Sequence, residues 1–234
     1  MEKRLKTSEK FLILAHHPEK GRLVVSRQYF RYGLAGAILL DLCLDERIGF
    51  ENGRITARPG NTPADPVKGE VLKMITDSAR PRKTGYWVRK LAFLNTRYMK
   101  QIVAGLVSKR LVRIEDTKVL GIFPWSRTYL TESLTREKLI RQLRNDILAY
   151  RGDVNDSTAL AGLIEACRMW RILSTDRDEL KMIRSQIKRI IKDTPVAGAV
   201  GQTIRQVQAA IIASVTASVV ASTSANDRCT NQIL

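Results

Sequence analysis

A stretch of small residues with helical spacing, between Tyr32 and Ile48, sets the strongest limit on how this chain can fold. Its larger apolar residues recur every three or four positions, as on one face of an α-helix. They are Leu34, Ile38, Leu39 and Leu42, with glycine or alanine at 33 and 35–37. Because glycine has no side chain, another element can approach such a helix closely. The stretch therefore predicts a tightly packed helix.

Helical spacing also dominates the rest of the chain. Apolar residues at intervals of three and four predict helices over residues 67–79, 84–112, 135–150, 157–173 (capped by Asp156), 176–192 and 201–222. Two segments alternate instead: 48–58, with an Asn52-Gly53 turn, and 112–130, with a polar turn at 115–118. We expect a mainly α fold, a single-domain helical bundle surrounded by amphipathic helices, with one or two small β-hairpins.

The two ends of the chain differ in composition from its middle. Residues 1–10 are basic with almost no apolar content, which predicts a flexible arm and a fold that starts at Phe11. Residues 11–225 contain no internal repeat, low-complexity tract or long linker and are expected to form one helical domain. Residues 226–234 are expected to form a polar tail.

The charge balance points to a negatively charged partner. The chain has 40 Lys and Arg against 23 Asp and Glu, a formal net charge of +17. Such a surplus attracts polyanions. Net charge does not distinguish the phosphates of nucleic acid from those of lipid headgroups, and a basic, well-solvated surface with no particular partner is a third interpretation.

Three features bear on the compartment. The N-terminus has no apolar stretch of signal-peptide length, which predicts a protein that faces the cytosol. Residues 207–221 are interrupted by polar residues and fall short of the roughly 20 that span a bilayer, so we interpret them as a buried helix. Cys43 and Cys167 lie in apolar helical patterns and Cys229 near the end, which predicts buried thiols and no disulfide framework.

The sequence offers little that could carry catalysis. His16 and His17 are adjacent and precede a proline, without the second ligand at helical or hairpin spacing that a metal site needs. There is no Gly-rich phosphate loop and no nucleophile elbow. Asp41, Asp45 and Glu46 lie close together but are interpreted as balancing local charge. We therefore expect no enzymatic activity, no metal and no cofactor.

The predicted helix over 176–192 has a basic face. Its apolar residues Leu180, Ile183, Ile187 and Ile190 form one stripe, and Lys181, Arg184, Lys188 and Lys192 follow another. Such a helix can lie on an anionic bilayer with its cations toward the headgroups. The alternative is an ordinary solvated face.

A helix over 84–112 followed by a hairpin also matches the recognition helix and wing of winged-helix DNA-binding proteins. Its cations Arg89, Lys90, Arg97, Lys100, Lys109 and Arg110 could contact phosphates. No patterned set of Asn, Gln and Arg indicates base readout. Nucleic-acid binding is therefore the alternative to lipid binding, in a form that does not depend on base sequence.

Four segments together resemble the Golgi phosphoprotein 3 family. In chain order they are YGLAGAILLDLCL from Tyr32 with Arg47-Ile48, TPADP from Thr62 with EVL from Glu70, LVSK from Leu106, and VLGIFP from Val119. On this basis the chain is identified as a divergent member over roughly residues 11–221. The resemblance implies an all-helical bundle with a β-hairpin, which binds phosphatidylinositol 4-phosphate at Golgi membranes and links Golgi enzymes to coat proteins.

The resemblance also implies where a lipid pocket lies. The family's pocket combines a Trp, an Arg from the Gly-Leu-x-Gly helix, and two Arg spaced by three before the hairpin. In the same order, the corresponding positions of this chain hold Ser26, Ala35, Thr96 and Met99. Arg97 and Lys100 follow the last two positions by one residue, and such a shift turns a side chain by about 100° around a helix.

Two interpretations of these departures stay open. Either a different cationic pocket serves, with Arg27, Arg31, Arg97, Lys100 and Arg127 near Trp125, or selectivity for the inositol phosphate is absent. We favour the second, a general attraction to anionic lipid. Trp125 and Pro124 are candidates for insertion at the membrane interface, which suits an indole ring; local packing of Trp125 is the alternative.

The resulting functional hypothesis is a non-enzymatic, cytoplasmic, peripheral membrane protein that binds anionic phospholipid headgroups and acts as a membrane-trafficking adaptor. In a eukaryotic host, the resemblance implies the cytosolic face of the Golgi, with membrane-enzyme tails or coat proteins as partners. A winged-helix-like nucleic-acid binder is the alternative. The sequence specifies neither the host nor the oligomeric state.

Overall fold

The helix predicted from the small residues is α2 (Arg27–Leu44), and it forms the centre of the fold. Its first turn is capped by Ser26, whose hydroxyl accepts from the Tyr29 amide, and the residues between Gly33 and Cys43 are buried. A Cβ on Gly36 would lie 2.6 Å from Cγ1 of Val207 and 3.2 Å from Cδ2 of Leu163. The predicted close approach of a neighbouring element is therefore confirmed.

The protein is represented by a computed structural model that describes residues 5–51, 53–119, 123–131, 133–152, 155–193 and 204–217, with the backbone alone for 116–119 and 123–127. Besides α2, the helices are α1 (Thr7–Ala15), α3 (Pro66–Thr76), α4 (Thr84–Phe93), α5 (Asn95–Ser108), α6 (Ser133–Leu148), α7 (Asp156–Ala166), the 3-10 turn η1 (Trp170–Ile172), α8 (Arg177–Asp193) and a helix over 204–217. The predicted mainly α fold class is confirmed.

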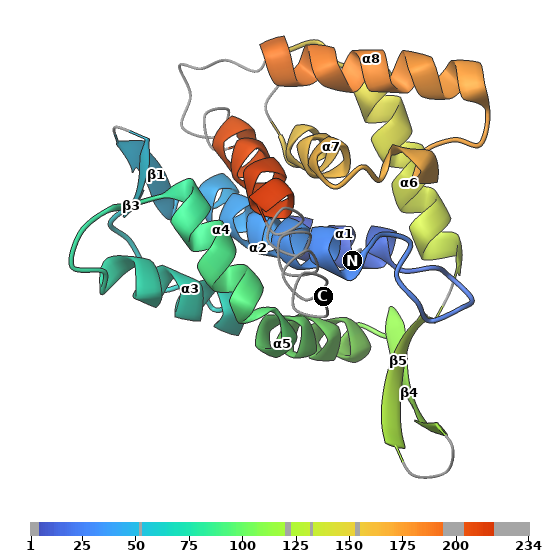
Figure 1. The fold of residues 1–234 in the computed structure, drawn as a ribbon, viewed down its shortest axis with the longest axis horizontal. Coiled ribbons are helices and arrows are strands. Elements are labelled where there is room, and N and C mark those ends of the chain that lie inside the picture. Colours follow the sequence, from blue (N-terminus) through green and yellow to red (C-terminus); the bar gives the residue numbers. More distant parts are fainter. Residues whose placement is uncertain are drawn as a thin grey trace, which may run out of the picture.

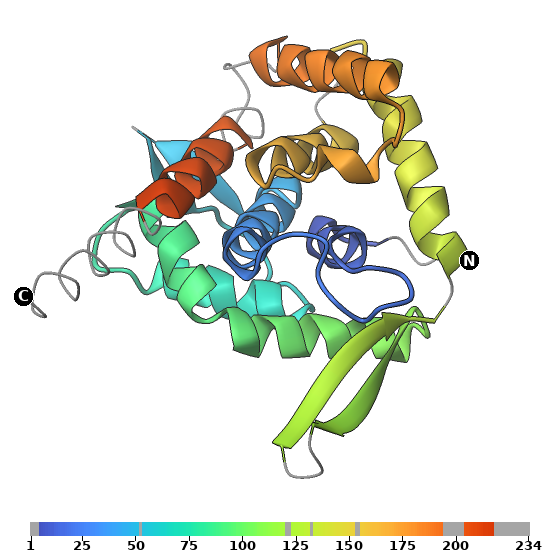
Figure 2. The same cartoon turned by 45° about the vertical axis from the view of Figure 1, so that its right-hand side comes forward.

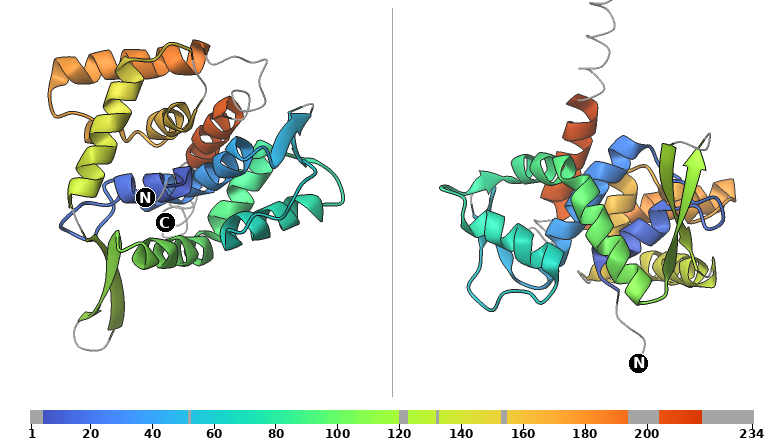
Figure 3. Two further views of the ribbon diagram at one scale, coloured as in Figure 1. Left: turned by 180° about the vertical axis from the view of Figure 1, so that it is seen from behind. Right: turned by 90° about the horizontal axis from the view of Figure 1, so that it is seen from below.

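The helices are arranged around α1 and α2. Helices α6, α7 and α8 lie on one side of this pair, and α3, α4 and α5 lie on the other (Figures 1 and 3). The helix over 204–217 packs along α2, where Val207 and Ile211 meet Gly36. Of the residues 207–221 interpreted as a buried helix, 207–217 are described and helical, with one face buried at Val207, Ile211 and Val215 and Ile212 exposed at 52% on the other. None of the described helices is long and apolar enough to cross a bilayer.

Both predicted hairpins are present. Strands β1 (Ile48–Glu51) and β2 (Arg54–Ala57) pair antiparallel, and the two-residue strand β3 (Arg82–Lys83) adds to the other edge of β2. Strands β4 (Val112–Val119) and β5 (Phe123–Leu130) form the second hairpin.

The predicted position of the turn in the second hairpin, at residues 115–118, is wrong. Residues 115–118 lie within β4, where Glu115 pairs with Arg127 and Lys118 with Pro124. The ribbon projects away from the helices (Figure 2), so its tip needs no apolar face and polar residues continue the strand. The polar character of residues 115–118 therefore does not indicate where the strand ends.

The start of the fold is a correction to the predicted arm over residues 1–10. Helix α1 begins at Thr7, and Thr7, Ser8 and Glu9 are buried. The reason is a distant cap: the Asp41 carboxylate on α2 accepts from the amides of Thr7 (2.7 Å) and Ser8 (3.1 Å). Residues 1–4 and the predicted tail over 226–234 lie outside the described residues. The prediction of one domain over 11–225 is corrected at its first residue and otherwise stays a prediction.

The predicted helix over 84–112 is two helices. Helix α4 ends and α5 begins around Leu94, whose ψ of 9° leaves the helical region. The break lets α4 pack on α2 while α5 turns to contact α3 and β4, so tertiary packing overrides a continuous apolar pattern. The predicted stripe survives the break, since Leu91 and Tyr98 are buried like the stripe residues that follow them.

The predicted cap of the helix over 157–173 is wrong by one residue. Asn155 caps α7 by accepting from the Thr158 amide at 3.1 Å. Asp156 instead accepts from the Thr7 hydroxyl at 2.5 Å and pairs with Lys10, which ties α7 to α1. The helix also ends early, at Ala166, because Arg168 takes a positive φ of 55° before η1.

Cysteine placement agrees with the prediction in the described part of the chain. Cys43 and Cys167 are both buried, and burial raises the pKa of Cys167. The Cys167 thiol donates to the Tyr29 carbonyl on α2 at 3.5 Å. Cys229 lies outside the described residues.

Asp41 should make stability depend on pH. Burial raises its pKa from 3.8 to about 6, although the Thr7 and Ser8 donors favour the charged form. A raised pKa means that the folded state binds a proton more tightly than the unfolded state does. The stabilisation that Asp41 gives the folded state is therefore complete below about pH 3.8 and is lost as pH rises through about 6. Each pK unit is worth about 1.4 kcal/mol, which gives a loss of about 3 kcal/mol.

The measurement compares urea unfolding of the wild type and Asp41→Asn between pH 4 and 7. The variant keeps an acceptor oxygen toward α1 but cannot titrate. The unfolding free energy of the wild type should therefore fall relative to that of the variant as pH rises from 4 to 7. A difference that stays constant with pH would contradict the raised pKa.

Candidate functional site

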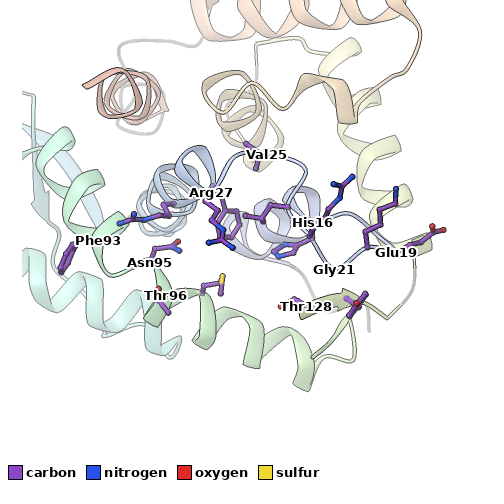
Figure 4. A pocket seen from close by; sticks show the side chains of 16 residues that line it. His16, Glu19, Gly21, Val25, Arg27, Phe93, Asn95, Thr96 and Thr128 are labelled. Carbon is purple, nitrogen blue, oxygen red and sulfur yellow. The ribbon is translucent and has the colours of Figure 1, made fainter. Parts of the chain in front are cut away.

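A cleft of about 1310 Å³ lies beside α2. One wall comes from the loop after α1 and the first turns of α2, and the facing wall from the α4–α5 junction. Thr128 and Tyr129, at the end of β5, close one side. Figure 4 shows Arg27 reaching from α2 toward the wall that carries Asn95 and Thr96.

Among the described side chains, four cations and one carboxylate line the cleft. The cations are Lys20, Arg22, Arg27 and Arg31, and the carboxylate is that of Glu19. Arg27 and Arg31 are one turn apart on α2 and are both exposed. The Arg31 Nε donates to the Ala92 carbonyl at 3.1 Å, which fixes its side chain against the end of α4. The cleft therefore has a positive wall open to solvent.

The floor of the cleft is formed in part by His16. Its ring is buried, Nδ1 lies 2.8 Å from the Leu12 carbonyl, and the ring meets Phe30 edge-on at 5.7 Å. Burial lowers the pKa of His16, so the ring is neutral at pH 7 and donates from Nδ1. In the part of the chain that the structure describes, no three metal-ligating side chains are grouped together. His16 acts as a packing residue in the cleft wall.

The two predicted cations on α5 are not brought to the cleft. Arg97 is exposed and its Nη2 lies 2.9 Å from Oε2 of Glu70 on α3, while Lys100 is exposed elsewhere on α5. Thr96 and Met99, one residue earlier, line the cleft instead. The two α5 positions that the resemblance assigns to a lipid pocket therefore line this cleft, and the assignment itself stays a prediction.

The other two positions derived from the resemblance lie at or behind the cleft wall. Ser26 caps α2 at the start of that wall, and Ala35 is buried in the helix at 2% exposure. None of the four family positions carries a charge in this chain. The positive charge of the cleft comes instead from α2 and from the preceding loop.

Sequence reasoning missed Lys20 and Arg22 as cleft residues. They flank Gly21, which takes a positive φ of 55° in the turn after His17-Pro18. The signal available was this Lys-Gly-Arg turn directly before the α2 cap, which places both cations next to Arg27.

Three predicted residues belong to the β4–β5 hairpin. Pro124, Trp125 and Arg127 pair along the backbone with Lys118, Thr117 and Glu115. Their side chains lie outside the described part of the structure, so the membrane-interface and headgroup roles assigned to them stay predictions.

The basic face of α8 differs from its predicted form. Ile183, Ile187 and Ile190 are buried as predicted. Arg184, however, is half-buried and stacks over Trp170 with its Cζ 4.1 Å from the ring centroid. Lys181, Lys188 and Lys192 remain exposed, so the face presents three lysines around a stacked arginine.

Comparison with known proteins agrees with this architecture. The family model for Golgi phosphoprotein 3 (GPP34) matches residues 8–207, far more than half of the chain. No curated protein matches the chain. The match spans α1 through the start of the helix over 204–217, and includes both walls of the cleft. The chain belongs to the Golgi phosphoprotein 3 family.

Proposed function

We propose that this chain is a peripheral membrane protein that binds anionic phospholipid headgroups in the cleft beside α2. The observation that carries the proposal is the set of cations on its wall, Lys20, Arg22, Arg27 and Arg31 against the single carboxylate of Glu19. Family membership supports a Golgi phosphoprotein 3-like role. Phosphate groups are the ligands that guanidinium and ammonium groups recognise in such a setting.

The proposed binding follows charge and does not select the inositol phosphate. Recognition of one headgroup isomer requires donors fixed on several sides of the ligand. The wall on α5 offers Thr96 and Met99 instead of two arginines, and the cations lie on the opposite wall. A set of cations on one side, faced by neutral side chains, accommodates any anionic headgroup.

The expected strength is modest. A Lys or Arg near an anionic leaflet contributes about 1 kcal/mol, so the four cleft cations together supply about 4 kcal/mol. The formal net charge of +17 adds a long-range attraction that salt screens. Binding should therefore be reversible and should weaken between low and physiological ionic strength.

The trafficking-adaptor part of the proposal, with membrane-enzyme tails or coat proteins as partners at the cytosolic face, rests on the family alone. The cleft and its cations support the lipid contact. The two parts are separable, because a lipid contact can be measured with the purified chain.

The test is co-sedimentation with vesicles in which phosphatidylserine, phosphatidic acid or phosphatidylinositol 4-phosphate is added at equal total charge. Binding should follow charge, and Arg27→Gln/Arg31→Gln should weaken it by roughly tenfold to thirtyfold. The matched control Arg97→Gln/Lys100→Gln removes the same charge outside the cleft and should cost threefold or less, by screened attraction alone.

Two outcomes would overturn the proposal. Strict dependence on phosphatidylinositol 4-phosphate would show a stereospecific pocket. Equal losses for the two double variants would show that the cleft is not the binding site. A binding measurement with duplex DNA at physiological salt tests the nucleic-acid alternative. Tight duplex binding without vesicle binding would show that the partner is nucleic acid and not lipid.

A further inference from the structure

A second basic pocket lies at the opposite end of α4 from the cleft. It has a volume of about 420 Å³ and is formed by β2, β3, the first turns of α4 and the helix over 204–217. Figure 1 shows α4 beginning directly after β3 and beside that helix. The cleft contacts Phe93 at the last turn of α4, so the two cavities share a helix but no lining residue.

Among the residues that the structure describes, four cations and no carboxylate line this pocket. They are Arg54, Arg82, Lys83 and Arg89. Within the described residues, none of the four has an ion-pair partner. Arg54 is held by the Pro81 carbonyl, to which its Nη1 donates at 2.9 Å, and Arg82 stacks over Tyr86 at 5.1 Å. Uncompensated like charges repel one another, and a bound anion relieves that repulsion.

The helix end in this pocket is open. Lys83 occupies the N-cap position in an extended conformation and its side chain accepts no hydrogen bond from the first turn. Gly85, at the second position of the helix, has no side chain to cover the backbone. The Nη1 of Arg89 lies 3.4 Å from the site where a Cβ on Gly85 would be. Open amide donors and a guanidinium are thus side by side at the positive end of the helix dipole.

A buried hydroxyl gives independent support. Thr84 lines the pocket, is 2% exposed, and its Oγ1 has no hydrogen-bond partner among the described residues. A buried hydroxyl without a partner is costly. It donates readily to an oxyanion, and a ligand in the pocket would provide that acceptor.

We propose that the N-terminus of α4 binds a phosphate-type oxyanion through the first-turn amides, the Thr84 hydroxyl, and the side chains of Lys83 and Arg89. Arg54 and Arg82 complete the positive wall. The ligand chemistry is a phosphate with at least two free oxygens, either inorganic phosphate or the phosphate of a phosphorylated headgroup. The proposal does not rest on lipid binding in the cleft.

Calorimetric titration of the full chain with inorganic phosphate at low ionic strength tests the site. Lys83→Gln and Arg89→Gln should each raise the Kd about tenfold, the effect of one charge-assisted hydrogen bond. The matched control Lys188→Gln removes one exposed cation of α8 and should leave the Kd within about twofold. Equal affinity in the pocket variants and the wild type would overturn the proposal.

Thr84→Val separates a ligand-binding role from a structural one. The substitution keeps the shape of the side chain and removes the hydroxyl, so the Tm of the ligand-free protein should stay or rise. The Tm increase that phosphate produces should shrink, because at a fixed ligand concentration the stabilisation by a bound ligand falls with the logarithm of its Kd as the Kd rises. A lower ligand-free Tm with an unchanged phosphate effect would assign the hydroxyl to the fold and contradict the proposal.

Two further arms identify the source of the phosphate. If it is a headgroup, Arg89→Gln should weaken binding to vesicles with phosphatidylinositol 4-phosphate more than the α8 control does. If it is a free ion, vesicle binding should match that control while phosphate binding is lost. Arg27→Gln/Arg31→Gln should keep phosphate binding in either case, so failure of the cleft proposal is seen separately.

Discussion

Gly33→Leu is expected to lower the free energy of unfolding by about 3 kcal/mol or more, at the upper end of overpacking effects. A Cβ on Gly33 would lie 2.3 Å from Cζ of Phe11 and 2.6 Å from Sγ of Cys167. Neither neighbour can move aside, because both are buried and Phe11 stacks on Phe30 with ring centroids 6.0 Å apart. Any side chain at position 33 therefore separates α1 and α7 from α2.

Urea unfolding followed by circular dichroism measures the loss. A pair of alanine variants controls for helix propensity, which favours alanine over glycine by about 1 kcal/mol. Gly105→Ala on α5 would place its Cβ no closer than 3.9 Å to Oε1 of Glu9 and should stabilise the protein. Gly33→Ala should destabilise it. If Gly33→Ala and Gly105→Ala change the free energy of unfolding in the same direction, close packing at Gly33 is contradicted.

The local patterns predicted most of the helices because they are set by neighbours in the sequence. The small residues of α2 and the apolar stripe through Leu91 and Tyr98 depend on helical spacing, and both are buried as expected. Two of the errors fall where a group distant in the sequence decides. Helix α1 starts early because Asp41 caps it from α2, and the break at Leu94 depends on which helices α4 and α5 meet.

The candidate cleft was predictable in part for the same reason. Arg27 and Arg31 share one face of one helix, so their convergence follows from spacing. Arg97 was assigned to the same pocket, but its direction depends on how α5 is rotated against α2, and its carboxylate partner is Glu70 on α3. The pocket at the start of α4 has no sequence signal of this kind, since it joins strands, a helix end and a helix more than 100 residues later.

A buried ion pair holds the two walls of the cleft in place. Glu9 on α1 is 2% exposed, and Nζ of Lys109, just after α5, lies 2.6 Å and 2.7 Å from its carboxylate oxygens. The Lys6 amide also donates to Glu9, at 3.1 Å. Helix α1 leads into the loop that carries Lys20, and α5 carries Met99 on the opposite wall. The pair therefore fixes the spacing between the walls.

Glu9→Ala is expected to cost about 3 kcal/mol of unfolding free energy, because removing one member of a buried pair leaves the other without compensation. Lys109 retains 18% exposure of its side chain, which places the loss toward the lower end of the usual range. Urea unfolding measures it, and Asp178→Ala, which breaks the exposed pair with Lys181, should cost less than about 1 kcal/mol.

The double variant Glu9→Met/Lys109→Met separates charge pairing from packing. Replacing both partners with apolar side chains of similar length removes the unpaired charge, so most of the stability lost in Glu9→Ala should return. Vesicle binding of the double variant should stay close to that of the wild type, because the variant keeps the cations Lys20, Arg22, Arg27 and Arg31 on the cleft wall. A double variant as unstable as Glu9→Ala would show that the carboxylate acts mainly through the Lys6 amide at the start of α1, and not by joining α1 to α5.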